Sequence, residues 1–251
     1  MAFIDNDKQV SLRVFEVPPG NSVSSARDVE YLCKLRYPRL RSSLHDVLIS
    51  SAPLTTSAVP SIPSVPFAHS PTADVLITVI FEYEVDSRTD TVVHLVPRST
   101  ILNQVSSIST SSRKFRNWKS WGPEGSRMLK LTSSNVWTCL SYGMKFIYCA
   151  VGGKYARVFD FNPYATTKDA NSSASCALLP WEPLPMETKI RSRRKPFKID
   201  MVTSLPGREA YALLPRMSVL GWEGAMITED HIVLILVSGS TIRVIFPLMT
   251  P

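Results

Sequence analysis

The fold class of this chain is limited most strongly by its short runs of β-forming residues, which are separated by turns of small residues. The clearest series lies at residues 126–161, where RMLKL, VWTCLSY, KFIYCAV and YARVFDF follow one another. Their separators, Ser-Ser-Asn, a glycine and Gly-Gly-Lys, are typical of turns. This spacing predicts an up-and-down antiparallel meander of four strands, which is the unit that repeats in β-propellers.

Other runs extend the β pattern along the chain. Alternating residues predict strands at 10–17 and 44–50. The strongly β-branched run at 75–85 predicts a buried strand that forms a hairpin with 91–96. FKIDMVTSL resumes a strand at 197–205.

A second meander is predicted near the carboxy end, where EGAMIT, HIVLILV and TIRVIFPL follow one another. Arg243 in the last of these runs echoes Arg157 in the first meander, which suggests similar blades. Between the β runs, a serine or threonine at 99–100 can cap a short helix whose apolar residues share one face. Those residues are Ile101, Leu102 and Val105.

Proline and charge mark two loops in this β-rich chain. The sequence has 251 residues, of which 44% are hydrophobic; only 10 are glycine, whereas 19 are proline. A proline-rich stretch at 51–73 is expected to be an extended loop, and a charged insert occupies 162–197. We therefore predict a single region over 1–251. It is mostly β, a partial β-propeller-like array of antiparallel meanders with one or two short helices.

Positive charge is the main indication of a partner. The formal net charge is +7 and the sequence pI is about 9.3, which favours contact with polyanions. Two segments are dense in Lys and Arg, RKFRNWK at 113–119 and KIRSRRKPFK at 189–198. In the first, Phe115 and Trp118 could stack on bases, or could pin the connection as an apolar staple. Because many proteins with a modest excess of positive charge bind no nucleic acid, a nucleic-acid-binding protein is the alternative function here.

The charged insert supplies the candidate partner-binding residues, which are Arg191, Arg193, Arg194 and Lys195. Charge of this density is expected to be exposed. We expect this loop to be poorly ordered in the isolated chain. Any partner that it binds should be acidic, and the contact should weaken with salt.

No catalytic or metal-binding constellation is found in the sequence. The four cysteines lack metal-ligand spacing and the four histidines lie near none of them, so no metal, cofactor or enzymatic activity is predicted. Glu82 and Glu84 are interpreted as the solvated face of a strand, and Asp160 as a carboxylate that caps a turn. The charged amino terminus and the lack of a long apolar run predict no signal peptide and no membrane contact, hence a cytoplasmic or nuclear location.

A series of segments, taken in order, resembles a known family. WKSWGPEGSRML is followed by VWTCLSYGMKFIYC, ARVFDFNPYA, FKIDMVTSLPGREA and GWEGAMITEDHIVLI, and is preceded by SPTADVLITVIFEYEV and VVHLVPRSTIL. Over about residues 65–235, their order and spacing resemble the carboxy-terminal, propeller-like region of the F-box proteins of mushroom-forming fungi. The resemblance implies a non-enzymatic protein-interaction module like the part of a ubiquitin ligase that recognises substrates.

Members of that family carry an F-box ahead of this region. No Leu-Pro-x-Glu helical start occurs in residues 1–45, so the chain resembles the carboxy-terminal half alone. We expect a protein partner, and a ubiquitin-ligase adaptor among the partners only if an F-box lies upstream.

The WGPEG stretch inside the first of these segments is interpreted as a structural corner that leads into a blade. Its proline fixes one dihedral angle, and Gly122 and Gly125 permit the turn. Trp121 is expected to pack beneath it.

Overall fold

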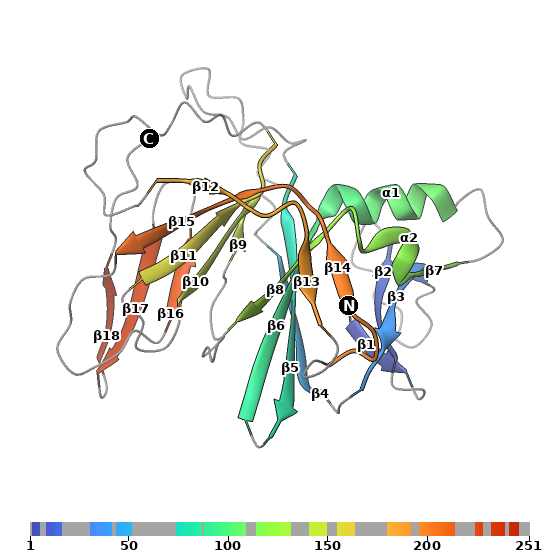
Figure 1. Ribbon diagram of the computed structural model, residues 1–251, viewed down its shortest axis with the longest axis horizontal. Helices are drawn as coiled ribbons and strands as arrows, with labels where there is room; N and C mark the ends of the chain where they lie inside the picture. The colour runs from blue at the N-terminus through green and yellow to red at the C-terminus, as the bar shows by residue number, and fades with distance from the viewer. Residues whose placement is uncertain are drawn as a thin grey trace, which may run out of the picture. The chain divides into compact units, whose positions relative to one another are not determined.

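The computed structural model of the protein is built mostly from β-strands, with two short helices in its described part (Figure 1). Contacts between Cα atoms divide the chain into two compact units, each made of three separate segments. Unit 1 comprises 1–49, 79–133 and 185–205, and unit 2 comprises 50–78, 134–184 and 206–251. The single region over 1–251 stays a prediction.

The structure describes most of the chain, with gaps. The described residues are 2–5, 9–16, 31–41, 44–51, 74–86, 88–108, 114–131, 141–149, 155–163, 180–191, 196–213, 224–227, 232–238 and 241–245. Apart from Ser51, the predicted proline-rich loop at 51–73 lies outside them.

A four-stranded sheet in unit 1 has the order β1-β2-β3-β7. Its strands are β1 (Ala2–Asp5), β2 (Gln9–Phe15), β3 (Tyr31–Arg39) and β7 (Phe115–Asn117). The first three pair antiparallel, whereas β7 pairs with β3 in parallel. Along β3, Cys33, Leu35 and Tyr37 are buried. Lys34 and Arg36, between them, are half-buried and so lie on the face away from the core.

Two helices lie beside β3 in unit 1: α1 (Arg98–Ile108) and α2 (Trp118–Trp121). The predicted short helix is therefore present, but it begins at Arg98, so Ser99 and Thr100 lie in its first turn and the predicted cap is wrong. Its predicted apolar face is wrong at Leu102, whose side chain is 46% exposed. Ile101 is buried as predicted, and Ile108 is buried with it, because positions seven apart fall on the same side of a helix.

A second four-stranded sheet, mostly in unit 1, has the order β4-β5-β6-β8. Its strands are β4 (Leu44–Ser51), β5 (Leu76–Val85), β6 (Arg88–Pro97) and β8 (Arg127–Leu131). The predicted hairpin is confirmed, since β5 and β6 are neighbours.

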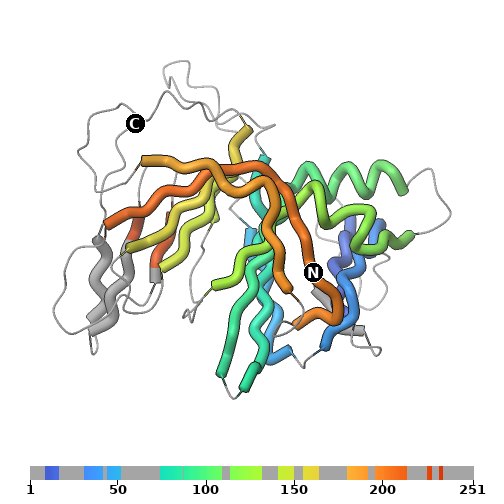
Figure 2. The backbone as a smooth tube through the Cα atoms, in the orientation of Figure 1, coloured from blue at the N-terminus to red at the C-terminus, as the bar shows by residue number. Residues whose placement is uncertain are grey.

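The placement of β8 corrects the predicted meander at 126–161. β8 pairs antiparallel with β6, with Leu129 opposite Val93, and not with the strand that follows it. Residues on both faces of β8 are buried, so this strand needs packing on two sides. A two-stranded sheet of β13 (Thr188–Ile190) and β14 (Met201–Thr203) runs beside the free edge of β8, where the Met128 N–H donates to Thr203 Oγ1 at 2.9 Å (Figure 2).

The main sheet of unit 2 has the order β12-β15-β11-β10-β9. Its strands are β9 (Ser141–Tyr142), β10 (Lys145–Cys149), β11 (Tyr155–Asp160), β12 (Glu182–Pro183) and β15 (Arg208–Leu213). β9, β10 and β11 are the last three strands of the predicted meander. β15, an element that the sequence did not reveal, takes the fourth place beside β11.

The second predicted meander is confirmed as the sheet β16-β17-β18 in unit 2. Its strands are β16 (Gly224–Ile227), β17 (Ile232–Ser238) and β18 (Thr241–Ile245). Aliphatic side chains from both sheets form the core of this unit: Ile147, Ala156, Val158, Ala212, Ala225, Ile227 and Ile232. The described strands of the whole chain form five separate sheets, none of them a closed barrel or propeller.

Candidate protein-interaction site

The WGPEG stretch forms a buried corner in unit 1, as predicted. Trp118 and Trp121 in α2 are 6% and 3% exposed. The reason for the glycines differs from the prediction, because Gly122 has an ordinary helical φ of −83°. A Cβ atom there would lie 2.2 Å from the ring of Trp118, and one on Gly125 would lie 2.7 Å from Thr100. These glycines provide room for neighbouring side chains rather than an unusual backbone angle.

His94 on β6 lies in the aromatic cluster around this corner. Its ring centroid is 5.4 Å from that of Tyr37 and 5.3 Å from that of Trp118. Its Nδ1 is 2.7 Å from the Tyr37 hydroxyl and its Nε2 is 2.6 Å from Ser126 Oγ. The Ser126 hydroxyl donates to the carbonyl of Gly122, so Ser126 Oγ accepts from the Nε2–H of His94. Nδ1 then accepts from Tyr37.

This arrangement of serine, histidine and tyrosine does not suit nucleophilic catalysis. A serine nucleophile must give its proton to the histidine, whereas here the Ser126 hydroxyl donates to a carbonyl. Ser126 and His94 are both fully buried. Burial lowers the pKa of His94 to about 3, which keeps the imidazole neutral. The network therefore organises the core.

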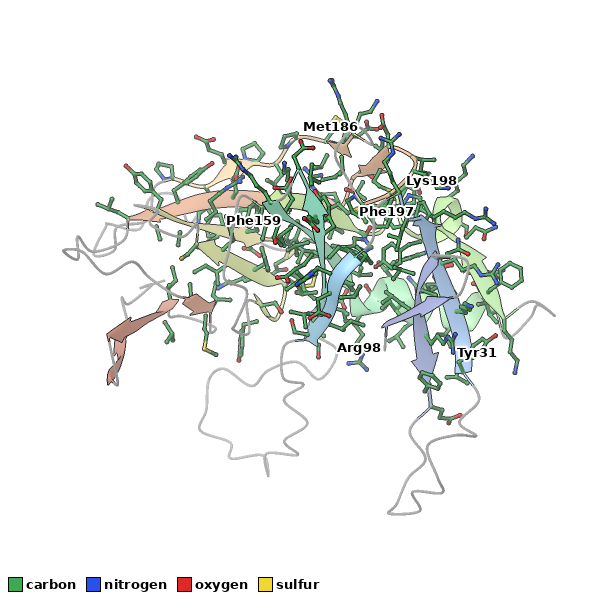
Figure 3. The ribbon with its side chains drawn as sticks, turned by 90° about the horizontal axis from the view of Figure 1, so that it is seen from below. Tyr31, Arg98, Phe159, Met186, Phe197 and Lys198 are labelled. Atoms are coloured by element: carbon green, nitrogen blue, oxygen red, sulfur yellow. The ribbon has the colours of Figure 1, made fainter. Side chains whose placement is uncertain are left out.

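Arg127, which follows Ser126, is a fully buried cation in unit 1. Its guanidinium donates to the carbonyl of Pro185 at 2.6 Å, to that of Leu205 at 3.3 Å and to that of Met186 at 3.4 Å. These carbonyls come from the segments on either side of β13 and β14. Arg127 thus holds the backbone here, while the side chain of Met186 stays 91% exposed (Figure 3).

Part of the first basic segment is tied into the sheet. Phe115 and Arg116 belong to β7, while Arg113 lies outside the described residues. Trp118 is buried against Tyr37, with ring centroids 5.7 Å apart, so its suggested stacking on bases is wrong and the alternative of an apolar staple is confirmed. Phe115 remains half-exposed.

The candidate partner-binding residues of the insert are described only in part. Arg191 follows β13 and is exposed, as predicted. Arg193, Arg194 and Lys195 lie outside the described residues, and their role stays a prediction. The insert also contributes β12 and β13, so it is not a loop throughout.

The carboxylates singled out in the sequence have structural roles. Glu82 is half-buried and Glu84 is exposed on β5, in agreement with a solvated face. Asp160 caps a turn as predicted, since its Oδ1 accepts the backbone N–H of Asn162 at 3.0 Å. Its Oδ2 also accepts from Arg208 at 2.9 Å, a buried ion pair that the sequence did not reveal.

The outer face of β11 and β15 in unit 2 presents a group of exposed and half-exposed side chains. We call Tyr155, Arg157, Tyr211 and Leu213 the aromatic–arginine patch. Tyr155 lies directly opposite Leu213, and Arg157 directly opposite Tyr211. Tyr155 is 45% exposed and Leu213 is 52% exposed, whereas the alternate residues on both strands face the core.

Contacts within the patch hold its side chains in place. The rings of Tyr155 and Tyr211 meet edge to face, with centroids 6.5 Å apart. The guanidinium of Arg157 lies 5.7 Å from the centroid of Tyr211 and 5.0 Å from that of Phe159. It also pairs with Glu209, whose Oε2 is 2.5 Å from Nη2. Since cross-strand pairs restrict rotamers, the patch is rigid before any partner arrives.

Sequence reasoning missed this patch because it missed β15. REAYAL is rich in good helix formers and short, so it gave no clear strand signal. The available signal was the alternation of Ala210 and Ala212 with larger residues, where small side chains face the core.

The described part of the chain offers no site for a metal ion. No three His, Cys, Asp or Glu side chains come together within it. Burial raises the pKa of Cys33 to about 11 and that of Cys149 to about 12, so both thiols stay protonated at neutral pH. Neither helix in this part is long and apolar enough to cross a bilayer.

Comparison with known proteins gives no relative, since no family model, no curated protein and no solved structure matches the chain.

Proposed function

We propose that this chain is a non-enzymatic protein-interaction module and that the aromatic–arginine patch of unit 2 contacts its partner. The observation that carries the proposal is the group of Tyr155, Arg157, Tyr211 and Leu213 on two paired strands, in which Tyr155 and Leu213 are exposed and the other two are half-exposed.

The composition of the patch suits a protein partner. Tyrosine and arginine are enriched among residues that dominate binding energy at protein interfaces. Tyrosine offers a large contact area with few rotatable bonds, so it loses little entropy on binding. Arg157 is already held by Glu209 and by two rings, which lowers the ordering cost further.

The polar groups of the unit 1 core support a role without catalysis. The Ser126–His94 pair is fully buried, and its hydrogen bonds run in the wrong direction for a nucleophile. Arg127 is likewise committed to backbone carbonyls.

The resemblance to fungal F-box proteins suggests what kind of module this is. It would be the propeller-like part that recognises substrates for a ubiquitin ligase, acting in the cytoplasm or nucleus. The sheets of unit 2 are antiparallel, as the blades of such a propeller are, although they have five and three strands where a blade has four. A ligase adaptor would join the partners only through an F-box upstream.

Affinity capture with variants of the patch tests this proposal. The tagged chain, a Tyr155→Ala/Leu213→Ser variant and a Leu102→Ser/Leu48→Ser control are expressed in the source cells, and bound proteins are quantified by mass spectrometry. Leu102 and Leu48 are exposed apolar residues outside the patch, 46% and 38% exposed. We expect at least one protein to be lost about tenfold from the patch variant and retained by the control.

Circular dichroism of the purified variants must first show unchanged β content. If every captured protein binds the patch variant as well as the wild type, the patch is not the contact surface.

A further inference from the structure

The positive charge of the chain belongs to one of its two units. Unit 1 contains 21 of the 28 Lys and Arg residues and 13 of the 21 Asp and Glu residues, which gives it a net charge of +8. Unit 2 contains the remaining seven and eight, which gives −1. These counts include every residue of each unit, so they do not depend on which ion pairs form.

Within unit 1 the cations gather in three segments. Residues 31–41, 113–119 and 189–198 contain four, four and six Lys or Arg residues, together half of those in the chain. None of the three segments contains an Asp or a Glu. The first follows β3, and the other two are the basic segments recognised in the sequence.

The fold brings the two basic segments to the same strand. β7 pairs in parallel with β3, and the Lys34 N–H donates to the Lys114 carbonyl at 2.8 Å. At the other end of β3, the Lys198 N–H donates to the Arg39 carbonyl at 2.9 Å, beside a bridge between Leu40 and Phe197.

Two views show this second junction. Figure 2 shows the orange segment that precedes β14 next to the blue end of β3. In Figure 3 the labelled Phe197 lies among the core side chains and Lys198 lies at the surface, as their burial requires.

We propose that β3 and the two segments that flank it form a binding site for single-stranded nucleic acid. The cations of the site are Lys34, Arg36, Arg39, Arg41, Lys114, Arg116 and Lys198. Cations on segments whose sequence contains no carboxylate attract a phosphate backbone. β3 has nine residues and is therefore about 30 Å long, a length on which β-sheets track short single strands.

Aromatic rings beside the cations favour nucleic acid over an acidic protein. The guanidinium of Arg36 lies 4.3 Å from the centroid of Phe115, on the face of the sheet away from the core. Arg13 on β2 lies 5.7 Å from the ring of Tyr31, at the start of β3. Bases stack on such rings and on guanidinium planes, whereas an acidic peptide gains nothing from them.

Fluorescence anisotropy with the full chain tests the site. The probe is a labelled oligothymidylate of about 20 nucleotides, titrated at about 50 mM and about 200 mM salt. The site variant is Arg39→Glu/Lys198→Glu, in which both residues are exposed. The control is Arg88→Glu/Arg98→Glu, which changes the net charge of unit 1 equally but outside the site.

The site variant should bind at least about tenfold more weakly, with the slope of log affinity against log salt reduced by about two. The control should lose less than about threefold. Equal losses would show attraction by net charge alone and would overturn the proposed site, as would no binding of the wild type at low salt. Equal or tighter binding of polyglutamate or phosphatidylserine vesicles would overturn the assignment to nucleic acid.

A Phe115→Leu variant separates stacking from charge. It should weaken oligothymidylate binding by about threefold to tenfold and leave the salt slope unchanged, because the phosphate contacts remain. Unchanged affinity in this variant would overturn the stacking role and with it the preference for nucleic acid.

Discussion

The two units of this molecule place their polar side chains differently. Unit 1 buries Arg127, His94 and Ser126 among tryptophans and tyrosine, and satisfies them with specific hydrogen bonds. Unit 2 buries an ion pair between Asp160 and Arg208, whereas its pair between Arg157 and Glu209 is half-exposed on the outer face of its main sheet.

This difference teaches where each unit is sensitive to change. Removing one member of a buried hydrogen bond costs free energy, because the group that remains has neither a protein partner nor water to bond with. A half-exposed ion pair loses little, because water replaces the missing partner. Arg127 and His94 in unit 1 should therefore be far more sensitive to substitution than Arg157 in unit 2.

Replacing a buried arginine by methionine should have the largest effect. Arg127→Met removes the donor to the carbonyls of Pro185, Met186 and Leu205, and we expect the free energy of unfolding to fall by about 3–5 kcal/mol. Arg157→Met, the matched change in unit 2, should cost about 1 kcal/mol or less. Urea unfolding followed by circular dichroism measures both, and similar losses would contradict the comparison.

Acid should weaken unit 1 through His94. Burial holds the pKa of the folded imidazole at about 3, below its ordinary value of 6.5. As the pH falls below about 6.5, the unfolded chain takes up a proton that the folded chain refuses until about pH 3. The stability that the neutral imidazole provides is therefore complete above pH 6.5, and about 2–3 kcal/mol of it is lost by about pH 4.5.

Two measurements isolate this contribution from that of other titrating groups. The C2–H resonance of His94 in the folded protein should not shift between about pH 8 and about pH 4.5. The loss of stability over the same range should also be smaller in a His94→Gln variant. A resonance that titrates near pH 6.5 would show that the imidazole is not buried as described.

Substitutions of two glycines, Gly122 and Gly143, should change the free energy of unfolding least. The order of alanine and asparagine should be opposite at the two positions. Gly122→Ala places a methyl group against Trp118 and should cost about 1–3 kcal/mol. Gly143 in unit 2 has a φ of +54° with open space around it, so alanine there should cost about 1 kcal/mol. Asparagine should be better than alanine at 143 and worse at 122; the same order at both positions would contradict the two explanations.

Local features of this fold could be predicted from the sequence, whereas long-range pairings could not. The hairpin of β5 and β6, the helix α1 and the sheet β16-β18 depend on neighbouring residues, whose periodicity the sequence displays. β8 was assigned to the wrong sheet because its partner β6 lies upstream, beyond an entire helix. The residues near β8 in the sequence do not show whether it pairs with β6 or with the strand that follows it.

The candidate sites show the same division. The basic segments were visible as composition, but their meeting at β3 depends on a parallel pairing and on a bridge between Leu40 and Phe197. β3 itself was missed although Cys33, Leu35 and Tyr37 alternate with polar residues, because Pro38 interrupts the run. The aromatic–arginine patch needed β15, whose alanines read equally well as helix.

Because each unit is made of three separate segments of the chain, unit 1 cannot be completed early during translation. Arg127 emerges well before its acceptors, since Pro185 and Leu205 follow it by 58 and 78 residues. At ordinary rates of synthesis this interval is roughly 3–16 s. During it, unit 1 lacks β13, β14 and Phe197, so the edge of β8 that faces away from β6 has no neighbour. A nascent chain of this protein therefore exposes an unpaired strand edge for seconds, and such edges favour aggregation unless a chaperone binds them.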